Sequence, residues 1–403
     1  MMQITYRALV LGCLLATAAG GAAPASAQSS APEPAPPPRV VTVDGRYVFD
    51  VIGVAAGGDA RGAGALGNLE LTAEGDLDRL VGWHGARAHV HLLSNHGRAI
   101  NDLAGTLQGI DNIEVAEGRT KLYEAWIEQT FAHDRLALLV GLSDLNADFY
   151  QNDAAGLLIA PAFGIGSELA STGPNGPSIF PSTALTARLN IAVAPSAYLR
   201  AAVVDARAGV LGDAAGVDLT MQDGALLIAE GGSTRGGGKL AFGVWRYTRR
   251  QDDLRAVDLD GSPLRRIARG AYGLLDQRLV GDDAHGVAIF VRAGMSDGQT
   301  TQFRGGIQAG LLATGLIAGR PHGQLSLGIA HALLSSGFKD QLRDAGERPD
   351  MAETGLELTY QDRIAPFLSV QPDLQYVRRA YGNGARRDAL ILGLRIIAAF
   401  ERH

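Results

Sequence analysis

The sequence predicts an all-β fold, a closed antiparallel transmembrane β-barrel of about sixteen strands. Three features of the chain predict it. The N-terminus carries an export signal, apolar and polar residues alternate over many segments of roughly ten residues, and the connections between these segments alternate between short and long. Each feature is common on its own, but outer-membrane barrels combine all three.

The N-terminal segment 1–27 matches a secretory signal peptide. It has one charge, at Arg7, then the apolar run 8–19, and small residues up to a cleavage site after Ala27. The alternative is a lipoprotein anchor at Cys13, although the apolar run before this cysteine is short for that role. Because Cys13 is the only cysteine, cleavage after Ala27 leaves no disulfide and no cysteine-based metal site.

The mature chain is expected to divide into two parts. Residues 28–44 are rich in Pro and Ala and predict an extended periplasmic linker. Residues 45–403 are expected to form the barrel, because a single all-β domain can exceed the usual domain length.

Apolar residues make up 46% of the sequence, and those of the mature chain are arranged by alternation. No mature segment has the roughly 18 uninterrupted apolar residues that a membrane-spanning helix needs. The segment 184–193 instead places apolar side chains on one face of a strand and Thr186, Arg188 and Asn190 on the other. The same pattern holds in the segments 87–92, 123–131, 287–293 and 303–311. In an outer-membrane barrel the apolar face contacts lipid and the polar face lines a wet lumen.

The connections between the predicted strands are sorted by length. The strands are expected to begin near Tyr47, Gly67, His84, Lys121, Asp134, Thr183, Ser196, Gly224, Gly237, Ala268, Gly286, Gln302, Gly323, Ala352, Ala365 and Ala389. Tight turns mostly alternate with long loops at 95–120, 144–182, 207–223 and 249–267, although the connections that flank 302–313 break this contrast. Short turns at one end and long loops at the other are typical of outer-membrane barrels. A soluble β-sandwich or jelly roll has no reason to sort its loops in this way.

Four blocks of residues, taken in order, resemble a known family. They are 82–85 with 107–114, 121–129 with Asp144 and Phe149, Tyr272 with Asp276-Gln277 and Gly305-Gly306, and 357–360 with 371–377 and 389–395. Along nearly its whole mature length the chain resembles the OprB-type carbohydrate-selective porins. One departure is at the C-terminus, where Glu401, Arg402 and His403 follow Phe400, whereas such porins usually end at an aromatic residue.

The resemblance implies a porin-like barrel in the outer membrane of a Gram-negative bacterium, through which small sugars diffuse passively. It implies no cofactor and no enzymatic activity. The expected partners are small sugars, outer-membrane lipid and the barrel-assembly machinery. Both a monomer and a homotrimer fit, and the sequence does not reveal which sugar passes.

Charged side chains on the polar strand faces are candidate pore-lining residues. A sugar-selective pore needs groups that exchange hydrogen bonds with hydroxyls without holding the sugar tightly. The candidates are Arg87, His89, Glu124, Glu128, Arg188, Arg200, Arg292 and Arg304. Since polarity is expected everywhere in a lumen, each could equally be an ordinary solvated wall residue. The segment 144–182 could fold inward and narrow the lumen or face the outside.

Other kinds of site have less support. His89 and His91 share a strand face at metal-ligand spacing, but no third ligand is evident, so no metal site is predicted. No nucleophile elbow of a hydrolase is predicted either. The net charge of −6 argues against a nucleic-acid partner, which calls for clustered Lys and Arg. A general, weakly selective diffusion porin and, less strongly, a secreted β-rich carbohydrate-binding protein remain as rival hypotheses.

Overall fold

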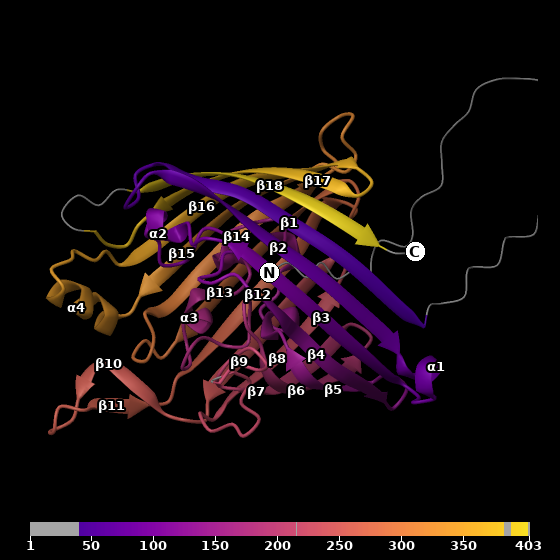
Figure 1. Cartoon of the computed structure of the whole chain (residues 1–403), viewed down its shortest axis with the longest axis horizontal. Helices are drawn as coiled ribbons and strands as arrows, with labels where there is room; N and C mark the ends of the chain where they lie inside the picture. The colour runs from indigo at the N-terminus through magenta and orange to yellow at the C-terminus, as the bar shows by residue number, and fades with distance from the viewer. Residues whose placement is uncertain (1–39, 215, 383–387, 402–403) are drawn as a thin grey trace, which may run out of the picture.

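The computed structural model describes residues 40–214, 216–382 and 388–401, which form a closed barrel of sixteen antiparallel strands (Figure 1). Each strand pairs with its neighbour in the chain, and β1 pairs with β18 to close the sheet. The strands of the barrel are β1 (Val41–Ala56), β2 (Gly62–Asp76), β3 (Ala86–Gly97), β4 (Thr120–Phe131), β5 (Leu136–Ser143), β6 (Ala184–Ala194), β7 (Ala197–Asp205), β8 (Ala225–Arg235), β9 (Gly238–Tyr247), β12 (Arg269–Gly281), β13 (Gly286–Ser296), β14 (Phe303–Thr314), β15 (Gln324–Leu334), β16 (Ala352–Ala365), β17 (Leu368–Arg378) and β18 (Ala389–Glu401). The predicted fold class is confirmed.

The barrel begins earlier in the chain than the sequence pattern indicates. β1 starts at Val41, inside the segment 28–44 that was expected to be a linker, because its backbone pairs with β2 as far as Val41 opposite Gly75. The alternation of Val41 and Val43 with Thr42 and Asp44 is too short, directly after the Pro/Ala-rich run, to distinguish a strand from a linker. From β3 onward the strands begin within about three residues of the expected positions. The predicted signal peptide 1–27 lies outside the described residues.

The two ends of the barrel differ as expected. One end carries the long loops, including α4 (Ser336–Asp344), and the other carries tight turns and α1 (Leu77–Val81) (Figure 1). The loop 249–267 also contains a hairpin of β10 (Gln251–Val257) and β11 (Pro263–Arg266), which the sequence pattern did not predict. The connection 297–302, between β13 and β14, is short although it lies at the end of the barrel that carries the long loops. The exception to the alternation of short and long connections that the sequence showed around β14 is therefore present in the structure.

The apolar strand faces point outward. In β6, Leu189 exposes 38% of its surface whereas the adjacent Arg188 exposes 7%. Exposed apolar side chains recur around the barrel at Val51, Leu71, Val90, Val140, Val203, Val244, Ile307, Leu327, Leu358, Leu374 and Leu394. Such a continuous apolar outer surface is what a barrel in contact with lipid requires.

Among the described residues, no helix is long and apolar enough to cross a membrane.

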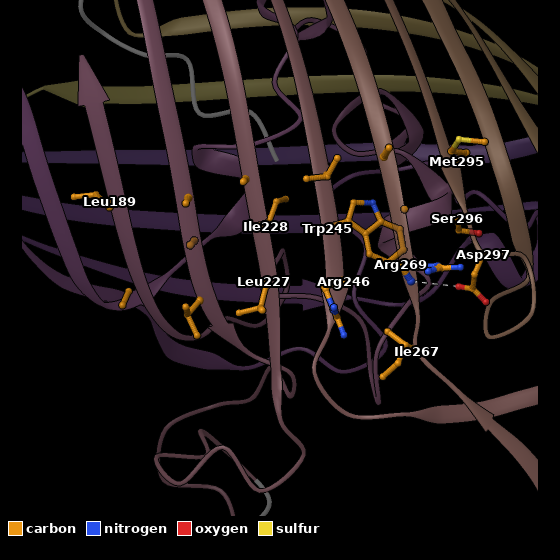
Figure 2. A pocket seen from close by; sticks show the side chains of 18 of the residues that line it. Leu189, Leu227, Ile228, Trp245, Arg246, Ile267, Arg269, Met295, Ser296 and Asp297 are labelled. Carbon is orange, nitrogen blue, oxygen red and sulfur yellow. Dashed lines mark hydrogen bonds between the residues drawn. The ribbon is translucent and has the colours of Figure 1, made fainter. Parts of the chain in front are cut away.

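A groove of about 1040 Å³ runs over the outer surface of β5 to β13 (Figure 2). It forms where the outward residues are small, at Ala187, Ala201, Ala229 and Ala271, between larger neighbours such as Leu189. Because these side chains face away from the lumen, the groove is part of the outer surface of the barrel and lies outside the channel.

Placing a charge on the apolar outer surface is expected to destabilise the barrel. Leu327 on β15 lies opposite Leu311 and Leu358, so Leu327→Arg would put a guanidinium among apolar neighbours. We expect a loss of about 2–4 kcal/mol, measured by denaturant unfolding in lipid vesicles. Leu259→Arg, in the exposed turn between β10 and β11, is the matched control and should leave the stability unchanged. Equal stability of both variants would mean that Leu327 does not face lipid.

Candidate functional site in the lumen

The connection between β5 and β6, residues 144–183, folds into the barrel; we call it the inward loop. Its backbone N–H groups donate to inward carboxylates on strands that lie far around the barrel from β5 and β6. Ala154 N donates to Asp276 of β12 at 3.1 Å, and Ala160 N donates to Glu357 of β16 at 2.9 Å. A loop that leaves β5 and reaches β16, which lies on the other side of the barrel, must cross the lumen, so the alternative of an outward-facing loop is wrong.

Arg292 of β13, a strand that lies between β12 and β16 in the barrel, also holds the inward loop. Its guanidinium donates to the carbonyl oxygens of Tyr150 at 2.8 Å, Ala162 at 2.8 Å and Gly164 at 3.0 Å. Nε also donates to Gln308 of β14 at 3.1 Å. Only 1% of Arg292 is exposed, so this predicted pore-lining residue instead anchors the loop.

The inward loop also forms a small apolar core inside the barrel. Phe149, Tyr150 and Leu169 of the loop pack against Tyr272 and other inward side chains of β7 to β12. This packing fixes the loop against one side of the wall, because apolar side chains leave the lumen water by covering each other.

Gly294 of β13 leaves room for the buried carboxyl of Glu168, which lies in α3 (Ser167–Ala170) of the inward loop. A Cβ at Gly294 would lie 1.7 Å from Glu168 Oε1, so any other residue would displace the loop. Burial raises the pKa of Glu168, while a hydrogen bond of 2.5 Å from the Tyr150 hydroxyl opposes this rise.

The connection between β3 and β4, residues 98–119, also turns inward and forms the second inward loop. Glu353 of β16 accepts from Leu107 N at 2.9 Å, and Gln375 of β17 donates to the carbonyl of Ile110 at 2.8 Å. Burial, together with the nearby negative charge of Asp50, raises the pKa of Asp111 in this loop. The two loops thus cover much of the inner wall from β8 round to β1.

The inner wall of β2 to β7 carries a row of paired charges that we call the charge ladder. Its members are, in order, Glu74, Arg87, Glu128, Arg188, Asp148 and Arg200. The successive nitrogen-to-oxygen distances are 3.0, 2.7, 2.9, 3.0 and 3.6 Å. Asp148 belongs to the inward loop, so the ladder joins the loop to the wall.

The ladder contains four of the eight predicted pore-lining residues: Arg87, Glu128, Arg188 and Arg200. The side chains of Arg87 and Arg200 keep 34% and 21% of their surface exposed, so both contact the open lumen. The charges of the ladder lie on neighbouring strands of one wall and neutralise each other. A field across the pore from these groups is therefore not supported.

His89 and Glu124 lie beside the ladder on β3 and β4. The His89 ring stacks on Trp126 at 4.8 Å, and Arg87 lies 5.2 Å from the centre of the same indole. Trp126 is thus a lumen residue and does not belong to an aromatic belt at the membrane surface.

Arg304 does not line the wall of the lumen. It is exposed at the loop end of β14, where the register shifts between Phe303 and Gly305. The alternation that predicted an inward side chain is interrupted by this bulge.

The residues that anchor the loops were missed as site residues. Glu353 and Glu357 on β16, and Gln371 and Gln375 on β17, lie four residues apart on their strands and are buried on the inward face. Their even spacing on polar strand faces is the signal that could have identified them.

Residues 294–298 do match the letters Gly-x-Ser-x-Gly of a nucleophile elbow. Ser296, however, ends a β-strand and donates to the Phe303 carbonyl at 2.6 Å. The strand-to-helix turn of a nucleophile elbow is therefore not formed there.

Comparison with known proteins agrees with this geometry. Residues 60–400 match the family of carbohydrate-selective porins called the OprB family. Porin B of Pseudomonas aeruginosa is 23% identical over 366 residues, which cover 81% of this chain and 79% of that protein. Among solved structures, OprB of Pseudomonas putida at high pH superposes with a TM-score of 0.77 at 21% identity, over 89% of this chain and 94% of that one. The outer membrane channel DcaP of Acinetobacter baumannii shares the fold, with a TM-score of 0.57 at 12% identity over 89% and 97% of the two chains.

The closed barrel, its apolar outer surface and its polar lumen are those of an outer-membrane channel of a Gram-negative bacterium. The family match extends over almost all of the barrel. The chain therefore belongs to the OprB family of carbohydrate-selective porins.

Proposed function

We propose that sugars pass along the lumen next to the wall of β2 to β7, and that the charge ladder is the surface they contact there. The observation that carries this proposal is a row of three arginines and three carboxylates paired in sequence, in which Arg87 and Arg200 still reach the lumen. Paired charges offer many donors and acceptors to hydroxyl groups and add no net charge. A neutral sugar can exchange its hydration for these groups and leave again.

The same pairing disfavours strong binding of an ion. Each carboxylate of the ladder already accepts from an arginine, so a cation gains little by displacing it. An anion meets the same difficulty at the arginines. The ladder therefore favours neutral polyhydroxy solutes over charged solutes of equal size.

We further propose that the protein performs no chemistry on the sugar and works without a cofactor. Passage down a gradient needs only a wet path with groups of moderate affinity. Insertion by the barrel-assembly machinery, and a monomeric or trimeric state, remain expectations from the family.

Liposome swelling is the direct test of selective passage. Vesicles that contain the mature barrel are expected to swell several-fold faster in glucose than in a zwitterionic amino acid of similar size. Vesicles without protein, and vesicles with heat-denatured barrel, serve as controls. Equal rates for glucose and the amino acid would favour the general diffusion porin. Swelling no faster than in protein-free vesicles would reject passage altogether.

A further inference from the structure

Two histidines and a carboxylate meet on the inner wall next to the charge ladder. His89 and His91 lie on β3 with one residue between them, so both side chains face the lumen. Glu124 lies directly opposite His91 on β4. One ligand atom from each of the three residues lies within 4.8 Å of the other two. The sequence showed the two histidines, and the fold brings Glu124 to them as a third ligand.

The spacing suits a small divalent cation. Glu124 Oε2 lies 3.3 Å from His91 Nδ1 and 3.9 Å from His89 Nε2. Zinc binds imidazole nitrogen and carboxylate oxygen at roughly 2.0–2.2 Å in tetrahedral geometry, so its ligand atoms are about 3.4 Å apart. The first distance already matches this value, and a small rotation of the His89 ring would shorten the second.

The surrounding residues hold the three side chains in place. The backbone N–H of Asp144 donates to Glu124 Oε1 at 3.0 Å, which leaves Oε2 directed at the histidines. The His89 ring stacks on Trp126 at 4.8 Å, and the His91 ring meets Tyr123 edge-on at 5.1 Å. In metal sites of proteins, neighbouring residues typically orient the ligand side chains in this way.

The ring nitrogens of the pair are poorly satisfied without a metal. The His91 side chain is 4% exposed and that of His89 is 11% exposed. Within the described part of the chain, neither nitrogen of His89 has a hydrogen-bond partner, and His91 Nε2 has none either. A hydrogen bond between His91 and Glu124 accounts for the burial of those two side chains. It does not account for the buried ring nitrogens of His89.

We propose that His89, His91 and Glu124 form a buried Zn²⁺ site in the lumen wall. Imidazole and carboxylate suit Zn²⁺, and two histidines with one carboxylate are a common zinc ligand set. This proposal is independent of which solutes permeate.

The test is Zn²⁺ binding to the folded, mature barrel in detergent, prepared without a histidine tag and treated with a chelator. Calorimetry and metal analysis are expected to show one Zn²⁺ per barrel. His89→Gln, His91→Gln and Glu124→Gln should each weaken binding at least roughly tenfold, since even the loss of an outer-shell partner costs about that much. His331→Gln, at a histidine on β15 that shares a hydrogen bond with Thr354, is the matched control and should bind as the unaltered protein does.

Two further measurements guard against variants that do not fold. A heat-modifiability gel checks that each variant forms a closed barrel. X-ray absorption of the unaltered, zinc-loaded barrel should show scattering from two imidazoles, which needs no substitution at all. A zinc spectrum with oxygen ligands only, or equal affinity of the unaltered barrel and a folded His89→Gln/His91→Gln variant, would overturn the proposal.

Discussion

Replacing Arg292 by methionine is expected to release the inward loop and widen the channel. We expect a larger single-channel conductance, more current noise and a smaller preference for sugars over other solutes. The barrel should also lose on the order of 3 kcal/mol of stability, because several buried carbonyl oxygens lose a charged donor. Planar lipid bilayers report the conductance, and unfolding in lipid vesicles reports the stability.

The expectation follows from what Arg292 contacts. Three of its hydrogen bonds go to backbone carbonyls of the inward loop, and methionine has a similar length but no donor. The loop is also held by Glu357 and by its own apolar packing, so it should become mobile without leaving the lumen.

Arg304→Met is the matched control for this experiment. Arg304 is an arginine on the neighbouring strand β14, but it is exposed and lies in a bulge. Its replacement should change neither conductance nor stability. Unchanged conductance of Arg292→Met, with the barrel folded, would show that the inward loop does not set the pore width.

Replacing Arg188 by glutamine is expected to shift the channel toward cations and to slow sugar passage. Arg188 bridges Glu128 at 2.9 Å and Asp148 at 3.0 Å, so its loss leaves the charge ladder with one excess negative charge. At an effective dielectric constant of about 20, a unit charge about 10 Å from a permeating ion is worth about 1.7 kcal/mol. Salt screens part of this energy, so a several-fold change in cation preference is the expected size.

The reversal potential in a salt gradient measures this shift, and liposome swelling measures the sugar rate. The double variant Glu128→Gln/Arg188→Gln restores the balance of charges and is expected to recover the original reversal potential. A double variant as cation-selective as Arg188→Gln would mean that charge balance in the ladder does not govern selectivity.

The alternation of apolar and polar residues was sufficient to predict the strands and the direction in which most of their side chains point. Alternation in β6 predicted that Arg188 faces inward and Leu189 outward, and both are found so. The prediction failed for Arg304, because the bulge in β14 adds a residue that no period of two can anticipate. It also failed for the hairpin of β10 and β11, whose charged residues show no alternation.

The site was only partly predictable. Arg87, Glu128, Arg188 and Arg200 could be named as inward charges, but their pairing depends on which strands are neighbours and on the position of Asp148 in the inward loop. The direction of that loop also depends on groups far away in the chain, such as Arg292, which binds the carbonyl of Tyr150 from β13. A loop's length carries no information about such partners.

By itself the sequence determined the architecture, because lipid outside and water inside impose a period of two on every strand. The tertiary structure alone decided which inward groups meet: which arginine anchors a loop, which charges pair, and that Glu124 joins two histidines. Those contacts arise from closing the barrel and folding two loops into it, and distances between residues far apart in the chain are set only at that step.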